Sequence, residues 1–206
     1  MIINGFDRWS HTYDSSALQP AYREAHHAVL TGVRRLVRCP GRILDVGCGT
    51  GQLLRLAGTV FPGSRLVGLD ASGGMLTVAG HRLPRVQAVA ERLPFRDHTF
   101  DLVLSTASIH HWSDDHLAMA EVRRVLVPGG LLGLADLAAA RRPGPAAVVV
   151  RRQPTPACAV ALAAAGLHTV SVDVVDGFGP VPAITIVLAQ HRPPGRLRRP
   201  RALAWG

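Results

Sequence analysis

The chain has 206 residues, of which 48% are hydrophobic and 18% are charged, so it suits one globular domain and not a disordered chain. Its formal net charge is +9, and the sequence contains no lysine, so arginine supplies this charge. No apolar run approaches the ~18 residues of a membrane-spanning helix, and the N-terminal residues lack the pattern of a signal peptide.

These features predict a cytoplasmic protein. Its three cysteines are odd in number and far apart, which is typical of reduced thiols in a reducing compartment. The uniform use of arginine in place of lysine indicates GC-rich codons, and so a bacterial source.

The predicted elements begin with a helix. Residues 1–14 are expected to be irregular, and apolar residues then recur at helical spacing over 17–38. Beyond this helix, short apolar runs alternate with helix-like segments. Strands are expected over 42–46, 65–70, 85–89, 100–108, 131–138, 168–175 and 183–190, and helices over 51–61, 71–83, 114–126 and 156–167.

Strands that alternate with helices predict an α/β fold with a doubly wound sheet and helices on both faces. The last two strands have no helix between them, so we expect seven strands, mostly parallel, with the last one antiparallel. We divide the chain into an N-terminal cap segment and helix (1–38), a ligand-binding domain (39–190) and a basic tail (191–206), which we expect to be disordered. Residues 138–156 are expected to form a loop.

The stretch "RILDVGCGTGQL", residues 42–53, places a glycine-rich loop directly after a buried strand. Its spacing is G-x-G-x-G and not the G-x-G-x-x-G of dinucleotide sites, and Asp45 stands two residues ahead of the first glycine. A carboxylate is a poor neighbour for a pyrophosphate but a good one for an ammonium or sulfonium group. Asp70 ends the second strand, where an acid commonly binds ribose hydroxyls. The pattern therefore predicts a phosphate-free cationic nucleoside, and S-adenosylmethionine fits that description.

Four segments in order, "ILDVGCGTG", "VGLDAS", "AERLPFRDHTFDLVLSTASIHHW" and "EVRRVLVPGGLL", resemble the motifs of class I S-adenosylmethionine-dependent methyltransferases. The resemblance covers about residues 42–136 and is closest to the small-molecule group with the ubiquinone/menaquinone-type enzymes. It implies a Rossmann-like sheet. The downstream "LAAAGLHTVSV" is similar to the family's last helix–strand unit, and "FDRWSHTYD" is similar to the N-terminal segment that folds over the cofactor.

The resemblance also implies a cofactor site whose residues follow the strand ends. These are Asp45, Gly47 and Gly49 for the methionine part, Asp70 for the ribose, Ala71 and Met75 beside the adenine, Ala90 and Glu91 at its polar edge, Ser105 beside the methyl group, and Tyr13 as a cover. The backbone N–H of Ala90 is expected to donate to the adenine ring. Val89 departs from the family, whose members often have an acid there that accepts from the adenine amino group.

Candidate general bases lie in "SIHHW", residues 108–112, after the fourth strand. Histidine has the right pKa to accept a proton near neutrality, and we favour His111 slightly over His110. Packing or helix capping is the alternative role for this pair. His26 and His27 are expected on a helix surface, and no metal site is expected.

The acceptor is expected to be a small molecule, with oxygen as the first choice of atom and nitrogen or carbon open. The arginines at 141, 142, 151 and 152 either attract an anionic acceptor or are simply solvated. Two alternatives stay open: an RNA or protein methyltransferase, to which the arginine-rich tail points, and a non-catalytic module that binds S-adenosylmethionine. Nucleic-acid binding is not favoured, because the tail has no interleaved aromatic residues. We expect a monomer or a homodimer.

Overall fold

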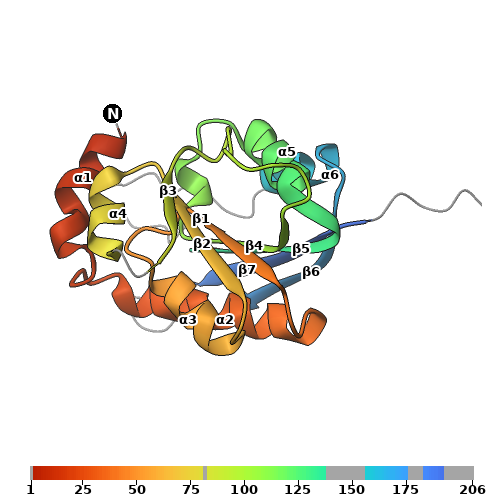
Figure 1. Cartoon of the computed structure of the whole chain (residues 1–206), viewed down its shortest axis with the longest axis horizontal. Coiled ribbons are helices and arrows are strands. Elements are labelled where there is room, and N and C mark those ends of the chain that lie inside the picture. The colour runs from red at the N-terminus through yellow and green to blue at the C-terminus, as the bar shows by residue number, and fades with distance from the viewer. Residues whose placement is uncertain (1, 81–82, 138–155, 176–182, 193–206) are drawn as a thin grey trace, which may run out of the picture.

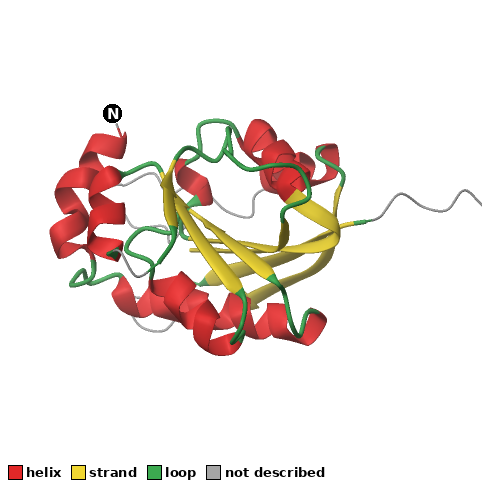
Figure 2. Cartoon of the chain, in the orientation of Figure 1, coloured by secondary structure: helices red, strands yellow, loops and turns green. Residues whose placement is uncertain are grey.

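The computed structural model describes residues 2–80, 83–137, 156–175 and 183–192, and its centre is a seven-stranded sheet between helices (Figures 1 and 2). The strands are β1 (Arg42–Val46), β2 (Arg65–Asp70), β3 (Arg85–Gln87), β4 (Phe100–Thr106), β5 (Leu126–Leu137), β6 (Leu167–Val175) and β7 (Ile184–His191). The helices are α1 (Ile2–Tyr13), α2 (Gln19–Leu36), α3 (Gln52–Val60), α4 (Gly73–Ala79), α5 (Asp115–Val125) and α6 (Pro156–Ala164), with a short 3₁₀ helix η1 (Ile109–His111).

The strand order is β3-β2-β1-β4-β5-β7-β6. The five strands from β3 to β5 are parallel, and β7 pairs antiparallel with both β5 and β6. The prediction of a mostly parallel, doubly wound sheet with an antiparallel last strand is confirmed. The strand order reverses between β1 and β4, and in such sheets ligands bind outside the carboxyl ends of the strands at this point.

Two apolar layers hold the helices on the sheet. Figure 1 shows α2 and α3 along one face and α5 and α6 along the other. The contact of α2 is close, because a Cβ added at Gly133 of β5 would lie 2.9 Å from a methyl carbon of Val33 and 3.0 Å from one of Val29. Each fully buried aliphatic side chain contributes roughly 1.5–3 kcal/mol, so these layers fix the strand ends that carry the site.

The N-terminal segment corrects the expectation that residues 1–14 are irregular, because residues 2–13 form α1. Phe6, Trp9 and Tyr13 recur at helical spacing, and their rings contact one another in series, with Trp9 centred 6.0 Å from Phe6 and 4.8 Å from Tyr13. Helix α1 packs beside α4 (Figure 1).

Strand β5 begins at Leu126, five residues before the predicted start of this strand. Leu126 pairs with Phe100, but the next pair joins Leu131 to Leu102, so the intervening residues form an irregularity in the ladder. Gly129, with φ of +89°, allows this bend. Helix α5 ends at Val125, so "PGG" lies within this irregular part of β5.

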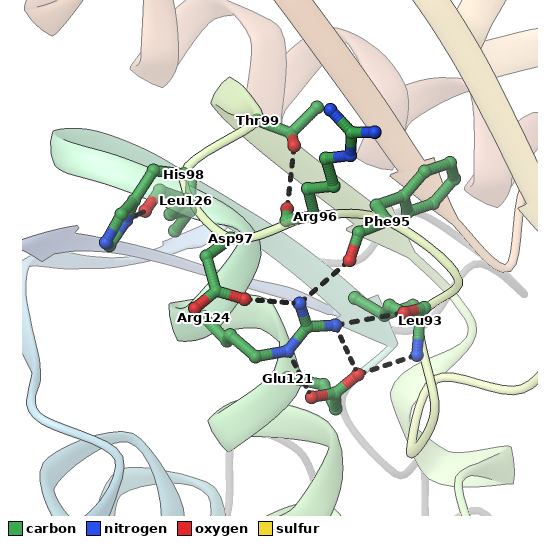
Figure 3. Close-up of polar contacts among 9 residues, drawn as sticks. All are labelled: Leu93, Phe95, Arg96, Asp97, His98, Thr99, Glu121, Arg124 and Leu126. Atoms are coloured by element: carbon green, nitrogen blue, oxygen red, sulfur yellow. Dashed lines mark hydrogen bonds and ion pairs between the residues drawn. The ribbon is translucent and has the colours of Figure 1, made fainter.

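The loop between β3 and β4 is held by one arginine of α5 (Figure 3). The guanidinium of Arg124 donates to the carbonyl oxygens of Leu93 and Phe95 at 2.9 and 2.8 Å. It also pairs with Asp97 at 2.8 Å and Glu121 at 2.6 Å. Glu121 accepts from the Leu93 backbone N–H at 2.8 Å, so this cluster ties the loop to α5.

Three expectations fall largely outside the described residues: the loop over 138–156, its four arginines, and the basic tail, of which the first residue, His191, closes β7. None of the helices within the described ranges combines the length and hydrophobicity that a bilayer crossing requires.

Candidate cofactor site

A cavity of about 390 Å³ lies at the carboxyl ends of β1, β2 and β4, which is within the usual size range of small-molecule sites. Most of the predicted site residues line it: Tyr13, Gly47, Gly49, Asp70, Ala71, Met75, Ala90, Glu91 and His111. A smaller cavity of about 30 Å³ adjoins it and shares Tyr13, Gly47, Gly49, Thr106 and Ala107 with it. The chain therefore brings distant strand ends together around one site.

The glycine loop crosses the end of β2. The backbone N–H groups of Gly47 and Cys48 both donate to the carbonyl oxygen of Leu69, at 2.7 and 2.9 Å. Gly47 has φ of +75°, and a Cβ there would lie 1.9 Å from the hydroxyl oxygen of Ser108. Gly49 has φ of +54° but open space around it. Glycine is thus required at the first position for packing and at both for backbone conformation.

Asp45 is buried, with 1% of its surface exposed, and it lines the smaller cavity. Within the described residues, neither of its carboxylate oxygens has a hydrogen-bond partner. Burial, and then the charge of Asp70, raises the pKa of Asp45 to about 8. A buried carboxylate without a partner is costly, and a cationic ligand group beside it would remove that cost.

Asp70 lies at the end of β2 and lines the larger cavity. One of its oxygens accepts from the Gly49 backbone N–H and the other from that of Ser72, each at 2.8 Å. Burial raises the pKa of Asp70, and these two N–H groups oppose that shift. Each oxygen still has a second lone pair, so the carboxylate can also accept from two neighbouring hydroxyls.

The opposite end of the cavity is lined by Ala71, Met75 and Ala90. In the described part of the chain, the Ala90 backbone N–H makes no hydrogen bond, so it can donate to a ligand. Val89 lines the cavity with 41% of its surface exposed, where the family often has an acid.

Glu91 borders the cavity but has a second task. One carboxylate oxygen accepts from the Ser113 backbone N–H at 2.5 Å and from that of Asp114 at 3.1 Å. Asp114 in turn caps α5 by accepting from the backbone N–H groups of His116 and Leu117. Glu91 therefore joins the cavity rim to the start of α5.

Helix α1 covers the cavity through Phe6 and Tyr13. One oxygen of Asp7 accepts from the Ser72 hydroxyl at 2.6 Å and from the Gly74 backbone N–H at 2.9 Å, and these bonds lower the pKa of Asp7. The Tyr13 ring stacks on Tyr22 of α2, with centroids 5.7 Å apart. Tyr13 was predicted from the sequence, whereas Phe6 and Asp7 were missed. The helical spacing of Phe6 from Trp9 and Tyr13 was an available signal for Phe6.

The structure does not bring two predicted residues into the lining of either cavity. Ser105 is buried inside β4, and the next residue, Thr106, lines both cavities instead. His110 turns towards Asp136, and the neighbouring His111 lines the larger cavity.

The expectation that His26 lies on a helix surface is wrong. It is half-buried and lines the smaller cavity, and burial lowers its pKa to about 4. His26 lies one helical turn beyond Tyr22, which lines the same cavity, so its spacing in α2 was a usable signal.

This set of groups fits S-adenosylmethionine. The unpaired Asp45 suits the ammonium group, Asp70 suits the ribose hydroxyls, and the Ala90 N–H suits an adenine ring nitrogen. Among the described residues, no cluster of three or more His, Cys, Asp or Glu side chains could hold a metal ion.

The comparisons with known proteins agree with this geometry. A family model described as a methyltransferase domain matches residues 44–134. Malonyl-[acyl-carrier protein] O-methyltransferase of Dechloromonas aromatica is 35% identical over 136 residues, which cover 66% of this chain and 50% of that protein. Demethylmenaquinone methyltransferase of Thermus thermophilus is 36% identical over 104 residues, which cover 47% of each chain. The chain thus spans about half the length of these curated relatives.

Among solved structures, a chain of the complex between the Haloferax volcanii Trm112 methyltransferase activator and a methyltransferase superposes with a TM-score of 0.75. The match covers 91% of this chain and 98% of that one at 19% identity, and it therefore shows a shared fold. The matched domain and these relatives identify residues 44–134 as a class I S-adenosylmethionine-dependent methyltransferase domain, whose cofactor is S-adenosylmethionine.

Proposed function

We propose that the protein transfers the methyl group of S-adenosylmethionine to a small-molecule acceptor, with oxygen as the methylated atom. The observation that carries the proposal is the pair of carboxylates in the cavities: Asp45, buried without a partner, and Asp70, which faces the ribose position. A pyrophosphate would be repelled by both, whereas a cationic nucleoside is attracted by the first and hydrogen-bonded by the second.

In this proposal the chain holds the cofactor from three directions. The glycine loop and Asp45 bind the methionine end, Asp70 binds the ribose, and Ala90 donates to the adenine. Tyr13 covers the site from α1, in keeping with a division into a cap of residues 1–38, a catalytic domain of 39–190 and a tail of 191–206. Once bound, the cofactor supplies a methyl group that its sulfonium already activates.

The remaining tasks of the protein are to align the acceptor, exclude water and remove a proton where the acceptor carries one. Phe6 and Tyr13 close the cavity with apolar and aromatic surface, so water is displaced from the methyl end. His110 and His111 supply the candidate bases. The relatives support small-molecule acceptors, because their names specify malonyl-[acyl-carrier protein] and demethylmenaquinone.

The test is incubation of the protein with methyl-labelled S-adenosylmethionine and a bacterial metabolite extract, followed by mass spectrometry. We expect label in one or a few small molecules and stoichiometric release of S-adenosylhomocysteine. The variant Asp70→Ala, at the same concentration of cofactor, should give little product. Label found only in RNA or protein, or no turnover despite binding, would contradict the proposal and favour one of the two alternatives.

A further inference from the structure

A histidine and an unpaired carboxylate line the same small cavity. His26 of α2 and Asp45 of β1 both line the smaller cavity, and neither residue lines the larger one. The Asp45 oxygens have no hydrogen-bond partner within the described residues, and the ring of the half-buried His26 makes no hydrogen bond there either. Two polar groups without partners in one enclosed space point to a ligand that pairs with both.

The cofactor carries two charged groups at its methionine end. Its ammonium and its carboxylate are bonded to the same carbon atom, so the cavity that receives one must also receive the other. Asp45, which we assign to the ammonium, lines only the smaller cavity. The volume of this cavity, about 30 Å³, leaves room for about two or three water-sized groups, which suits the two substituents. The rest of its lining must then supply donors to the carboxylate.

Most donors in this lining are already engaged. The Gln52 amide makes two hydrogen bonds, and the Thr50 hydroxyl donates to Asp14 at 2.7 Å. The backbone N–H groups over 47–49 donate to β2. Among the described residues, no arginine lines either cavity, and His26 is the one basic side chain in the lining of the smaller one. The ring N–H of His26 is therefore available to a carboxylate.

The start of α3 makes the same cavity favourable for a negative group. Gly51 precedes the helix without a side-chain cap, and the backbone N–H groups of Gln52 and Leu53 make no hydrogen bond in the described part of the chain. Both residues line the smaller cavity. Free N–H groups and the helix dipole favour an anion at this end of a helix. Helices α2 and α3 lie along the same face of the sheet (Figure 1), so both can contribute donors to one carboxylate.

We infer that the smaller cavity is the pocket for the amino-acid end of the cofactor, in which Asp45 binds the ammonium and His26 donates an N–H to the carboxylate. This inference deepens the proposed function, because it rests on the assignment of Asp45 to the methionine end. It makes His26 a specificity-determining residue, which distinguishes a cofactor with an intact amino-acid end from one that lacks the carboxylate.

The imidazole of His26 meets the carboxylate in its neutral form. Burial, and then the charge of His27, lowers the pKa of His26 to about 4. An adjoining carboxylate raises a histidine pKa by about 1–3, so the ring stays mostly neutral at pH 7.5 and keeps one N–H donor. Tyr13 from α1 and Tyr22 from α2 line the same cavity and are neutral at this pH, because burial raises the pKa of each phenol. Asp45 is thus the side chain that is charged beside the bound ammonium.

The first test removes the carboxylate from the ligand and leaves the protein intact. Calorimetric titration at pH 7.5 compares S-adenosylmethionine with decarboxylated S-adenosylmethionine, which keeps the ammonium, the sulfonium and the nucleoside. We expect the decarboxylated compound to bind the wild type roughly 10- to 100-fold more weakly. Equal affinities would overturn the inference, because the carboxylate would then have no effective partner in the pocket.

The second test removes the donor from the protein. His26→Leu should bind S-adenosylmethionine roughly 10- to 100-fold more weakly and the decarboxylated compound as the wild type does, so the preference between the two ligands disappears. His26→Gln keeps a neutral N–H donor and should retain part of this preference. His27→Leu, at the exposed neighbouring position of α2, is the matched control and should behave as the wild type.

Asp45→Asn separates the two halves of the pocket. It should weaken the binding of both ligands, because both carry the ammonium. A His26→Leu variant that weakens both ligands equally, or neither, would overturn the role of His26, and thermal unfolding of each variant confirms that it is folded.

These binding measurements do not depend on methyl transfer. A wild type that prefers S-adenosylmethionine over its decarboxylated form, but gives no labelled product, would support this inference and contradict the proposed function. A wild type that forms product and binds both ligands equally would overturn this inference alone.

Discussion

The carboxylate of Asp45 illustrates how a binding residue can lower the stability of the empty protein. Its pKa is 3.8 in an unperturbed chain and about 8 in the fold. The folded state therefore holds one more proton than the unfolded state across this window, so the free energy of unfolding falls as pH rises through it. The cost is fully present above pH 8 and disappears below about pH 4.

Replacing Asp45 by Asn should therefore stabilise the unliganded protein. We expect a gain of roughly 1–3 kcal/mol near pH 7.5, seen as a higher Tm, and a smaller gain at pH 5. Affinity for S-adenosylmethionine should fall. In the wild type, affinity should increase between about pH 5.5 and 7.5, where the amino group of the ligand stays mostly charged, and the variant should lose this increase. Thermal unfolding and calorimetry check both. A lower Tm at pH 7.5 would show that Asp45 has a partner in the empty protein.

Two glycines of the loop should separate folding from binding. Gly47→Ala places a methyl group against Ser108 in a left-handed conformation, and we expect a loss of roughly 2–4 kcal/mol of stability. Gly49→Ala places its methyl group in open space, so the loss of stability should be only ~1 kcal/mol. The same methyl group occupies part of the cofactor cavity. Denaturant unfolding and cofactor titration measure the pair. Equal stability losses would contradict this account of the loop.

At the scale of elements, α1 is attached to the rest of the site by few bonds. Asp7→Ala removes the acceptor of the Ser72 hydroxyl and the Gly74 N–H, so we expect faster release of S-adenosylhomocysteine, by roughly 3- to 30-fold. Arg8→Ala, on the exposed side of the same helix, is the control and should leave release unchanged. Stopped-flow displacement gives the rates, and matching rates for both variants would show that α1 does not retain the ligand.

The loop that carries Ala90 and Glu91 depends on α5 in a similar way. Arg124→Ala removes the donors to Leu93 and Phe95, so we expect faster amide hydrogen exchange in this loop and a stability loss of roughly 1–3 kcal/mol. The neighbouring Arg123, which makes no hydrogen bond in the described structure, provides the matched control Arg123→Ala. Exchange that stays equal in both variants would argue that the loop is held by apolar packing alone.

Secondary structure was predictable where periodicity and composition agree. The parallel strands are short apolar runs between helical segments, so their number and order along the chain could be read directly. The early start of β5 at Leu126 and its irregular pairing could not be read in this way, because "PGG" also ends helices and only pairing with β4 decides between the two outcomes. Helix α1 was missed because, after its two N-terminal isoleucines, its apolar positions are aromatic and most of the residues between them are polar.

For the whole molecule, the motif residues of the site were more predictable than the residues that tertiary contacts bring to it. Asp45, Gly49 and Asp70 belong to contiguous motifs at strand ends, and the topology brings strand ends together whatever the side chains are. His26 and Asp136 enter through contacts between elements far apart in sequence. No local pattern signals the contact of His110 with Asp136, so Asp136 emerged only with the fold, whereas the one-turn spacing of His26 from Tyr22 was a usable signal.

The central claim is that the glycine loop and its carboxylates bind a cationic, phosphate-free nucleoside. Calorimetric titration with S-adenosylmethionine, and in parallel with ATP, tests it most directly. We predict saturable binding of S-adenosylmethionine, no binding of ATP, and a loss of roughly 10- to 150-fold in Asp70→Ala. Asp101→Ala is the control, because Asp101 accepts from the Arg42 N–H at the opposite end of the strands. Binding of ATP, or an unchanged affinity in Asp70→Ala, would contradict the account.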